Sequence, residues 1–132
     1  MLRVENAAAV VCSAEASDSV KVDVILAGDE LLRALNAQWR HKDRPTDVLS
    51  FALEDAALAP ENALLGEVYV SLDRAREQAK DYDATLLEEV ARLVIHGTLH
   101  VLGYDHDAST EAREMRAREE CYMRLWRRGE MP

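Results

Sequence analysis

The 132-residue sequence has no long apolar run. Its longest uninterrupted apolar segment is residues 7–12, far short of the about 18 residues that a membrane-spanning helix needs. The N-terminus lacks a positively charged stretch followed by an apolar one, so we expect no signal peptide. Internal repeats, low-complexity segments and linkers are also missing. These absences predict a single domain over residues 1–132 that is cytoplasmic and makes no membrane contact.

Cysteines and basic side chains are both scarce. Cys12 and Cys121 match no metal-binding or redox spacing, so we expect reduced thiols. The 16 basic residues are outnumbered by 25 acidic ones, which gives a net charge of −9. A non-specific coat for nucleic acid would be basic overall, so this balance argues against that class and leaves room only for a local basic patch.

The hydrophobic pattern predicts strands and helices in mixed order. We expect strands over residues 20–26, 46–51 and 66–71, and helices over residues 29–40, 72–82, 84–102 and 109–128. Asp29 and Ser71 are placed to cap helices, and Gly103 is placed to end one. Since the order is not a strict β-α-β alternation, we expect an α+β domain whose small sheet is covered mainly by helices.

Three of the four histidines lie within eleven residues, at positions 96, 100 and 106. His96 and His100 are four residues apart on a predicted helix, so they share one face. Residues 93–102 are otherwise apolar on nearly every side, which predicts a buried helix end with two imidazoles that need partners. Gly103 then lets the chain turn back toward His106. A metal ion would satisfy all three rings.

Three neutral imidazoles and a water make the open tetrahedral site of a hydrolytic zinc centre. We therefore predict one Zn²⁺ per chain on His96, His100 and His106; the less favoured alternative is core histidines bonded to backbone or carboxylates. The spacing H-x-x-x-H-x-x-G-x-x-H is also that of the zinc-protease motif. Here Gly97 replaces the glutamate that serves those proteases as general base, which favours a different substrate.

A short basic segment follows the first predicted helix. Residues 33–44 hold four basic side chains against one acidic side chain, Asp43. These groups could contact phosphates, with Arg40 stabilising charge that develops on a scissile phosphate. On composition alone, an ordinary solvated loop is the favoured interpretation.

The segment HGTLHVLGYDH at residues 96–106 closely resembles the signature of the bacterial YbeY family of zinc-dependent endoribonucleases. NAQWR at 36–40, RPTDVLSF at 44–51 and LGEV at 65–68 agree with it, so the resemblance runs from about residue 20 to the C-terminus. It implies a zincin-like α+β fold with a buried metal-binding helix. It also implies cleavage of single-stranded RNA in 3′-end maturation of 16S ribosomal RNA and in ribosome quality control.

The resemblance assigns the zinc ligands to the three histidines and a functional arginine to Arg40, which we take as catalytic. Lys42 and Arg44 are our candidates for substrate binding. The implied partners are single-stranded RNA, ribosomal RNA and the small ribosomal subunit, with no DNA, and we expect a monomer. Family members usually have a helix before the first strand, and we expect residues 1–19 to be too short for it.

Two other functions stay open at this point. One is a zinc peptidase or another metal-dependent hydrolase, and the other is a ribosome assembly factor with a structural metal, which would normally need a fourth protein ligand. Asp47 and Ser50 could line a substrate groove or simply face solvent, and Asp105 could support a ligand or only form a turn. The interleaved charges of the last helix favour a salt-bridged solvent face. We assign its large apolar residues to the core: Met115, Tyr122, Met123 and Trp126.

Overall fold

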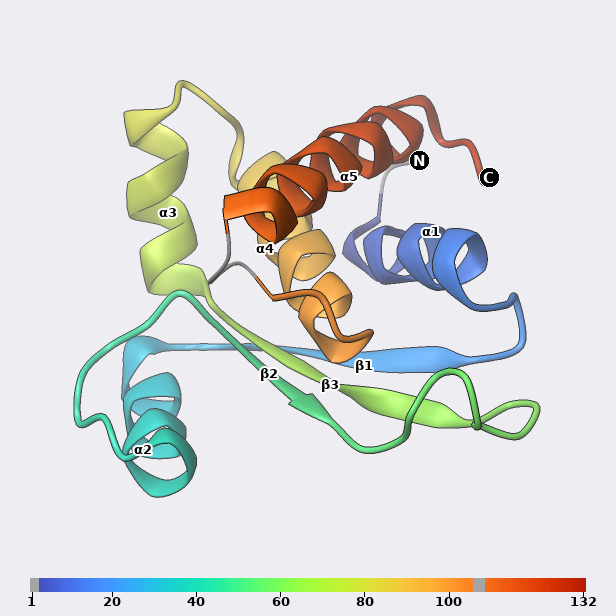
Figure 1. Cartoon of the computed structure of the whole chain (residues 1–132). Helices are drawn as coiled ribbons and strands as arrows, with labels where there is room; N and C mark the ends of the chain where they lie inside the picture. The colour runs from blue at the N-terminus through green and yellow to red at the C-terminus, as the bar shows by residue number, and fades with distance from the viewer. Residues whose placement is uncertain (1–2, 106–108) are drawn as a thin grey trace.

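The computed structural model describes residues 3–105 and 109–132, which form five helices and a three-stranded sheet (Figure 1). The elements in chain order are α1 (Val4–Glu15), β1 (Lys21–Ala27), α2 (Asp29–Arg40), β2 (Val48–Ala52), β3 (Leu64–Ser71), α3 (Leu72–Asp81), α4 (Leu86–Val101) and α5 (Ser109–Arg128). This arrangement confirms the predicted α+β class. The strands and helices predicted after residue 19 are all present, with ends that differ by about two residues or less.

The sheet has β3 in the centre, parallel to β1 and antiparallel to β2. Figure 1 shows α1, α3, α4 and α5 on one side of the sheet and α2 on the other. The register places Ser50, Val68 and Val24 in one row across the strands. Because alternate residues of a strand point to the same face, this row belongs to the face that α4 covers.

Helix α4 is the central helix and contacts α1, α3, α5, β2 and β3. It begins with a capping box, in which Thr85 Oγ1 accepts from the Glu88 backbone N–H and Glu88 Oε1 accepts from the Thr85 backbone N–H. Gly103, at φ 101°, follows its last turn, as predicted. From residue 90 onward its apolar side chains are almost fully buried, whereas Leu86 and Leu87 in its first turn are exposed. The buried ones are Val90, Ala91, Leu93, Val94, Ile95, Leu99 and Val101. The apolar surroundings predicted for His96 and His100 are therefore present.

Gly97 lets α4 approach the sheet closely. A Cβ at this position would lie 2.6 Å from Val68 Cγ1, 2.9 Å from Ser50 Oγ and 3.1 Å from Val48 Cγ2. Ser50 Oγ donates to the Gly97 carbonyl oxygen at 2.8 Å, which ties β2 directly to the helix. The glycine thus has a packing role that the sequence did not reveal, and a glutamate here would have to enter the same crowded interface.

The expectation that residues 1–19 are too short for a helix was wrong. Helix α1 takes up twelve of these residues and contacts α4, α5 and β1. Three turns are enough here because its buried side chains are small, so the helices can pack closely. They are Ala7, Ala8, Val10, Val11 and Cys12. Cys12 and Cys121 are free thiols, and burial raises the pKa of Cys12 to about 11.

Helix α2 departs from the sequence prediction at its start. Its N-cap is Gly28, which has no side chain to cap the helix, and the Asp29 backbone N–H donates instead to Asp73 Oδ2 of α3 at 2.9 Å. Asp29, predicted as the cap, lies inside the helix and accepts a hydrogen bond from Ser71 Oγ at 2.7 Å. Ser71 itself caps α3, as predicted, by accepting from the Arg74 backbone N–H. The Ser71 hydroxyl therefore holds the Asp29 carboxylate, which is then not used to cap its own helix. This hydrogen bond connects the start of α2 to the N-cap of α3.

Helix α5 is the longest helix, with 20 residues. It buries the residues assigned to the core: Met115, Tyr122, Met123 and Trp126. Trp126 Nε1 also donates to the Arg3 carbonyl oxygen at 2.7 Å. None of the helices within residues 3–105 and 109–132 has the length and apolar character needed to cross a membrane.

We expect Gly97→Ala to lower the free energy of unfolding by about 1–3 kcal/mol, because the added methyl group overpacks the interface with Val68. This loss should exceed the up to about 1 kcal/mol that alanine gains over glycine in a helix. Urea unfolding measures it. Val68→Ala removes the side chain that the added methyl group would contact. The loss of unfolding free energy caused by Val68→Ala should therefore be smaller in the Gly97→Ala protein than in the wild type. A Gly97→Ala protein more stable than the wild type would contradict the packing role.

Candidate active site

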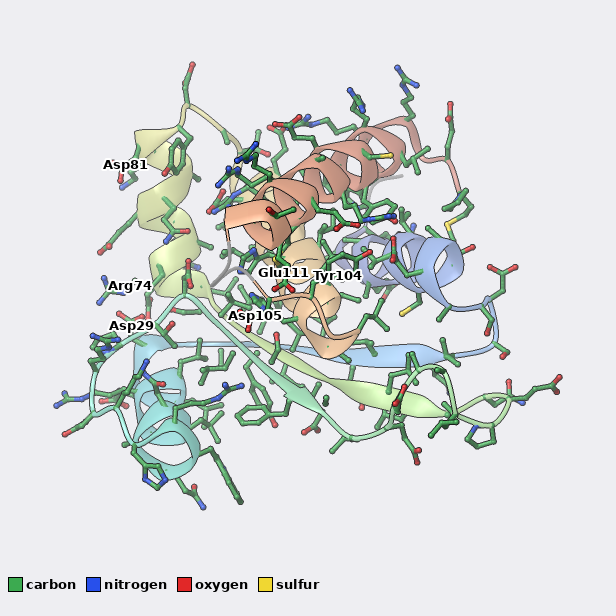
Figure 2. All side chains as sticks on the ribbon, in the orientation of Figure 1. Asp29, Arg74, Asp81, Tyr104, Asp105 and Glu111 are labelled. Carbon is green, nitrogen blue, oxygen red and sulfur yellow. The ribbon has the colours of Figure 1, made fainter. Side chains whose placement is uncertain are left out.

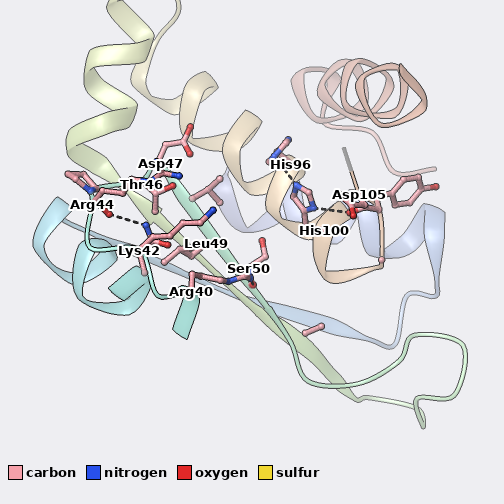
Figure 3. Close-up of a pocket in the computed structure, with 16 residues that line it drawn as sticks. Arg40, Lys42, Arg44, Thr46, Asp47, Leu49, Ser50, His96, His100 and Asp105 are labelled. Atoms are coloured by element: carbon pink, nitrogen blue, oxygen red, sulfur yellow. Dashed lines mark hydrogen bonds between the residues drawn. The ribbon is translucent and has the colours of Figure 1, made fainter. Parts of the chain in front are cut away.

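A cleft of about 960 Å³ lies between the loop after α2 and the second half of α4 (Figure 3). It is lined by Asn36, Arg40, Lys42, Arg44, Pro45, Thr46, Asp47, Val48, Leu49, Ser50, Ala52, His96, His100, Gly103, Tyr104 and Asp105. These residues come from two segments far apart in the sequence, 36–52 and 96–105. The tertiary structure therefore joins the basic segment and the histidine motif in one site.

His96 and His100 lie side by side on α4, and their Nε2 atoms are 3.1 Å apart. Their Nδ1 atoms point away from each other. Nδ1 of His96 is hydrogen-bonded to the Glu119 carboxylate on α5, and Nδ1 of His100 lies 2.8 Å from the Tyr104 carbonyl oxygen. A neutral imidazole whose Nδ1–H donates to an oxygen carries its lone pair on Nε2. Both rings are thus held with Nε2 toward the same point.

This arrangement fits a metal ion. Two nitrogen lone pairs that face each other across 3.1 Å repel, and a metal ion bound by both nitrogens, or a proton shared between them, removes that repulsion. Two nitrogens bound to one tetrahedral zinc at about 2.0–2.1 Å are about 3.3–3.4 Å apart, close to the observed separation. The third predicted ligand, His106, lies outside the described residues. Within those residues no group of three histidine, cysteine or acidic side chains is placed to hold a metal, so the ligand set stays a prediction.

Sequence reasoning missed Glu119. Its carboxylate is mostly buried, with 15% of the side chain exposed, and it fixes the orientation of the His96 ring. A carboxylate on the second nitrogen of a metal-binding histidine is a common arrangement in metalloproteins. Nothing in the sequence distinguishes Glu119 from the other acidic residues of α5, because its role depends on how α5 packs on α4.

Arg40, predicted to be catalytic, lines the cleft from the last turn of α2. Its Nη2 donates to the Ser50 carbonyl oxygen at 2.6 Å, and its guanidinium lies 5.6 Å from the centre of the Phe51 ring. The group is exposed, and among the described residues this is its only side-chain hydrogen bond. The contact with β2 therefore positions the guanidinium and leaves Nε and Nη1 for a ligand.

Lys42 and Arg44, the predicted substrate-binding residues, also line the cleft and are exposed. Their loop is held by the end of α2. His41 adopts a left-handed conformation, the Lys42 backbone N–H donates to the Asn36 carbonyl oxygen, and Asn36 Nδ2 donates to the Arg44 carbonyl oxygen at 3.0 Å. The loop thus has a defined path along the cleft.

Asp47 and Ser50 line the cleft, which is the position that the groove interpretation requires, and Asp105 lines it too. Asp47 Oδ2 accepts from Gln78 Nε2 at 3.1 Å, and the Ser50 hydroxyl is used in the contact with α4. Among the described residues, Asp47 and Asp105 are the only carboxylates of the cleft lining.

Tyr104, which is labelled in Figure 2, connects the cleft to the N-terminal helix. Its carbonyl oxygen holds His100, and its hydroxyl donates to Glu15 Oε1 at 2.7 Å. Glu15 also accepts from Arg118 Nη1 at 2.8 Å and from the Tyr122 hydroxyl. Burial alone would raise the pKa of Glu15, but the hydrogen bonds from Tyr122, Tyr104 and Arg118 outweigh it and lower the pKa. Burial and the bond to Glu15 raise the pKa of each tyrosine to about 12.

Comparison with known proteins agrees with the resemblance inferred from residues 96–106. A sequence model of the family described as Endoribonuclease YbeY matches residues 3–127. A Sulfurihydrogenibium protein of that name is 46% identical over 94 residues, which is 71% of this chain and 61% of that protein. The protein of the same name from Desulfitobacterium hafniense is 44% identical over 123 residues, 89% of this chain and 78% of that protein.

Solved structures are similar as well. The solution structure of TM1509 from Thermotoga maritima aligns with a TM-score of 0.65 and 32% sequence identity. The alignment covers 93% of this chain and 78% of that one. The similarities therefore extend over the cleft and the elements that build it.

Glu15→Gln should lower the free energy of unfolding at neutral pH by about 1–3 kcal/mol, because three donors lose a carboxylate acceptor. A carboxyl group whose pKa is lowered in the folded state stabilises the protein above its ordinary pKa of about 4.3. That contribution disappears as the pH falls through the lower folded-state value. Urea unfolding at several pH values should therefore show a wild-type advantage that shrinks in acid.

Glu5→Gln is the matched control for this experiment. Glu5 lies on the same helix and its side chain is 71% exposed. A stability difference between wild type and Glu15→Gln that stayed constant into acid would contradict the assignment to the carboxylate.

Proposed function

The chain belongs to the YbeY family of endoribonucleases, and from that premise we propose that it is a zinc-dependent enzyme that cleaves single-stranded RNA in the cleft. The observation that carries this proposal is the meeting of two features in one place. The converging Nε2 atoms of His96 and His100 lie in a cleft that also receives Arg40, Lys42 and Arg44. A cation site beside basic groups suits cleavage of a phosphodiester.

We assign one Zn²⁺ per chain to His96, His100 and His106, in a zincin-like arrangement on a buried helix. When bound, zinc supplies a water molecule whose pKa is lowered to about 7 and a positive charge next to the phosphate. The protein's contribution is orientation: Glu119 and the Tyr104 carbonyl oxygen each hold one imidazole by Nδ1. Both rings can then offer Nε2 without rearrangement.

Arg40 is the group we assign to the scissile phosphate. Its contact with the Ser50 carbonyl oxygen fixes the guanidinium at the edge of the cleft and uses one N–H of Nη2. The other N–H of Nη2 forms a fork with Nε or Nη1 that matches two phosphate oxygens. Lys42 and Arg44 lie on the ordered loop that follows and would bind neighbouring phosphates. A proton released in the cleft has Asp47 and Asp105 as acceptors among the described residues.

The packing of Gly97 speaks against the peptidase alternative. In zinc peptidases of this spacing, the residue at that position is the glutamate base. Here a Cβ alone would come within 2.6 Å of Val68 Cγ1, so the position belongs to the helix–sheet interface. The alternative of a structural metal would require a fourth protein ligand.

The proposed biological setting rests on the resemblance to the family. We propose that the substrate is ribosomal RNA of the small subunit, that the reaction matures the 3′ end of 16S RNA, and that the protein acts in ribosome quality control. We further propose that the protein is a cytoplasmic monomer that does not act on DNA. The net charge of −9 makes binding dependent on the few basic groups at the cleft, so substrate selection should be local.

Protein purified without added metal should contain one zinc per chain, with Zn–N distances of about 2.0–2.1 Å. Elemental analysis and X-ray absorption measure these two quantities. His100→Ala should lose the zinc and the activity, and a chelator should lower the melting temperature of the wild type, because binding stabilises the native state.

The matched control for metal binding is His41→Asn. His41 is an exposed histidine outside the motif, and asparagine tolerates its left-handed backbone. This variant should keep its zinc. The proposed zinc site would be contradicted if the purified wild type contained no metal and its melting temperature did not change when chelator was added.

Arg40→Lys should slow cleavage of single-stranded RNA by about 100-fold while zinc content and melting temperature stay near wild type, because an ammonium group cannot copy the fork. Arg33→Lys is the control, since Arg33 lies on the same helix, pairs with Asp43 and does not line the cleft. The assay compares labelled single-stranded RNA, duplex RNA and a peptide. Cleavage should weaken as salt rises.

The peptide arm decides between the two kinds of enzyme. Hydrolysis of the peptide without cleavage of RNA would overturn the proposed function. If Arg40→Lys cleaved RNA at the wild-type rate, the assignment of Arg40 would be wrong. Residues 40–44 would then be interpreted as an ordinary solvated loop.

A further inference from the structure

A second hollow, of about 460 Å³, lies between α4 and α5. It is lined by Arg92, Arg116, Glu119, Glu120, Met123, Arg124 and Arg127. Four of these seven residues are arginines. Arg116, Glu120 and Arg124 follow one another at four-residue spacing on α5, so they form one stripe of that helix. The stripe faces Arg92 on α4, and the hollow is therefore basic although both helices also carry acidic residues.

The two hollows together hold an unusual share of the positive charge. Seven of the chain's 16 basic side chains line them, but only four of its 25 acidic side chains do so among the described residues. The rest of the surface is therefore much more acidic than these linings. A polyanion would be repelled by most of the protein and would find its favourable contacts here.

The hollows adjoin each other at the histidine pair. Glu119 lines the second hollow and holds His96, which lines the first. Arg92 of the second hollow is bonded to Glu89, and its pKa is raised by that carboxylate and also by Glu119 and by Asp47 of the first hollow. Arg92 and Glu119 line the second hollow together, and Glu119 connects that lining to the first hollow through His96. One strand of nucleic acid could pass from one hollow to the other beside His96.

The arginines of the second hollow differ in their availability. Arg92 makes two hydrogen bonds to Glu89, at 2.8 and 2.6 Å, and Arg127 is paired with Glu88 at 3.2 Å. Arg116 and Arg124 are exposed and have neither a hydrogen bond nor an ion pair within the described part of the chain. The sequence led us to expect a salt-bridged face on α5, and these two positions do not follow it.

We propose that the hollow between α4 and α5 binds the phosphodiester backbone of single-stranded RNA through the guanidinium groups of Arg116 and Arg124. The RNA strand then runs from the Arg40 side of the cleft, past the histidine pair, into this second hollow. This inference rests on the proposed function, because it describes where the substrate of that site continues. Guanidinium groups suit the task, since their planar fork matches phosphate oxygens.

The test compares the double variant Arg116→Gln/Arg124→Gln with the wild type. A fluorescent single-stranded 2′-O-methyl oligonucleotide of about 16 nucleotides measures binding, and labelled RNA of the same sequence measures cleavage. Loss of two phosphate contacts should weaken binding about tenfold and should reduce the slope of log affinity against log salt by about 1.4. The melting temperature should not change, because both side chains are exposed.

Arg3→Gln/Arg128→Gln is the matched control. It removes the same charge from two exposed arginines that line neither hollow. This protein should bind the oligonucleotide within about twofold of the wild type, because contact and not net charge sets the affinity.

Binding and cleavage separate the two levels of inference. If the wild type cleaves RNA but the two double variants bind the oligonucleotide with equal affinity, the role of the second hollow is overturned. The proposed function is then left intact. A wild type that binds the oligonucleotide through Arg116 and Arg124 but cleaves no RNA supports the hollow and overturns the nuclease. A wild type that does neither overturns both.

Discussion

The close contact between α4 and the sheet at Gly97 determines where the groups of the cleft lie. Because this position has no side chain, the helix backbone comes near enough for Ser50 to bond the Gly97 carbonyl oxygen. His96 and His100 flank this contact, and on β2 the Ser50 carbonyl oxygen receives Arg40. The same short stretch of strand therefore positions the histidines on one side and the guanidinium on the other. Any side chain at position 97 would shift these groups together.

Two carboxylates outside the histidine motif support the site. Glu119 orients His96 from α5, and Glu15 holds Tyr104, whose carbonyl oxygen orients His100, from α1. The first and last helices of the fold thus each control one imidazole. Since neither helix supplies a residue of the motif, their contribution to the site is orientation. In metal sites, loss of such an orienting partner typically lowers metal affinity or activity about 10- to 100-fold.

The charge distribution explains how an acidic protein of this kind could select a polyanion. Most of the surface is acidic and repels RNA, whereas seven of the 16 basic side chains line the two hollows that adjoin at the histidine pair. Repulsion elsewhere makes every productive contact local, so substrate choice depends on a few guanidinium groups and not on general attraction. This is consistent with a nuclease that must spare most of the RNA around it.

The sequence by itself determined the strands and helices after residue 19, the caps at Ser71 and Gly103, and the shared face of His96 and His100, because each depends on neighbours within a few residues. Through the resemblance it also predicted that Arg40 acts together with the histidines, and it offered Lys42 and Arg44 as candidates for substrate binding. The tertiary structure alone decided the packing role of Gly97, the partners Glu119 and Glu15, and the basic hollow beside α5. Each of these joins elements 20 or more residues apart in the chain, and no local pattern specifies which of many similar side chains will meet.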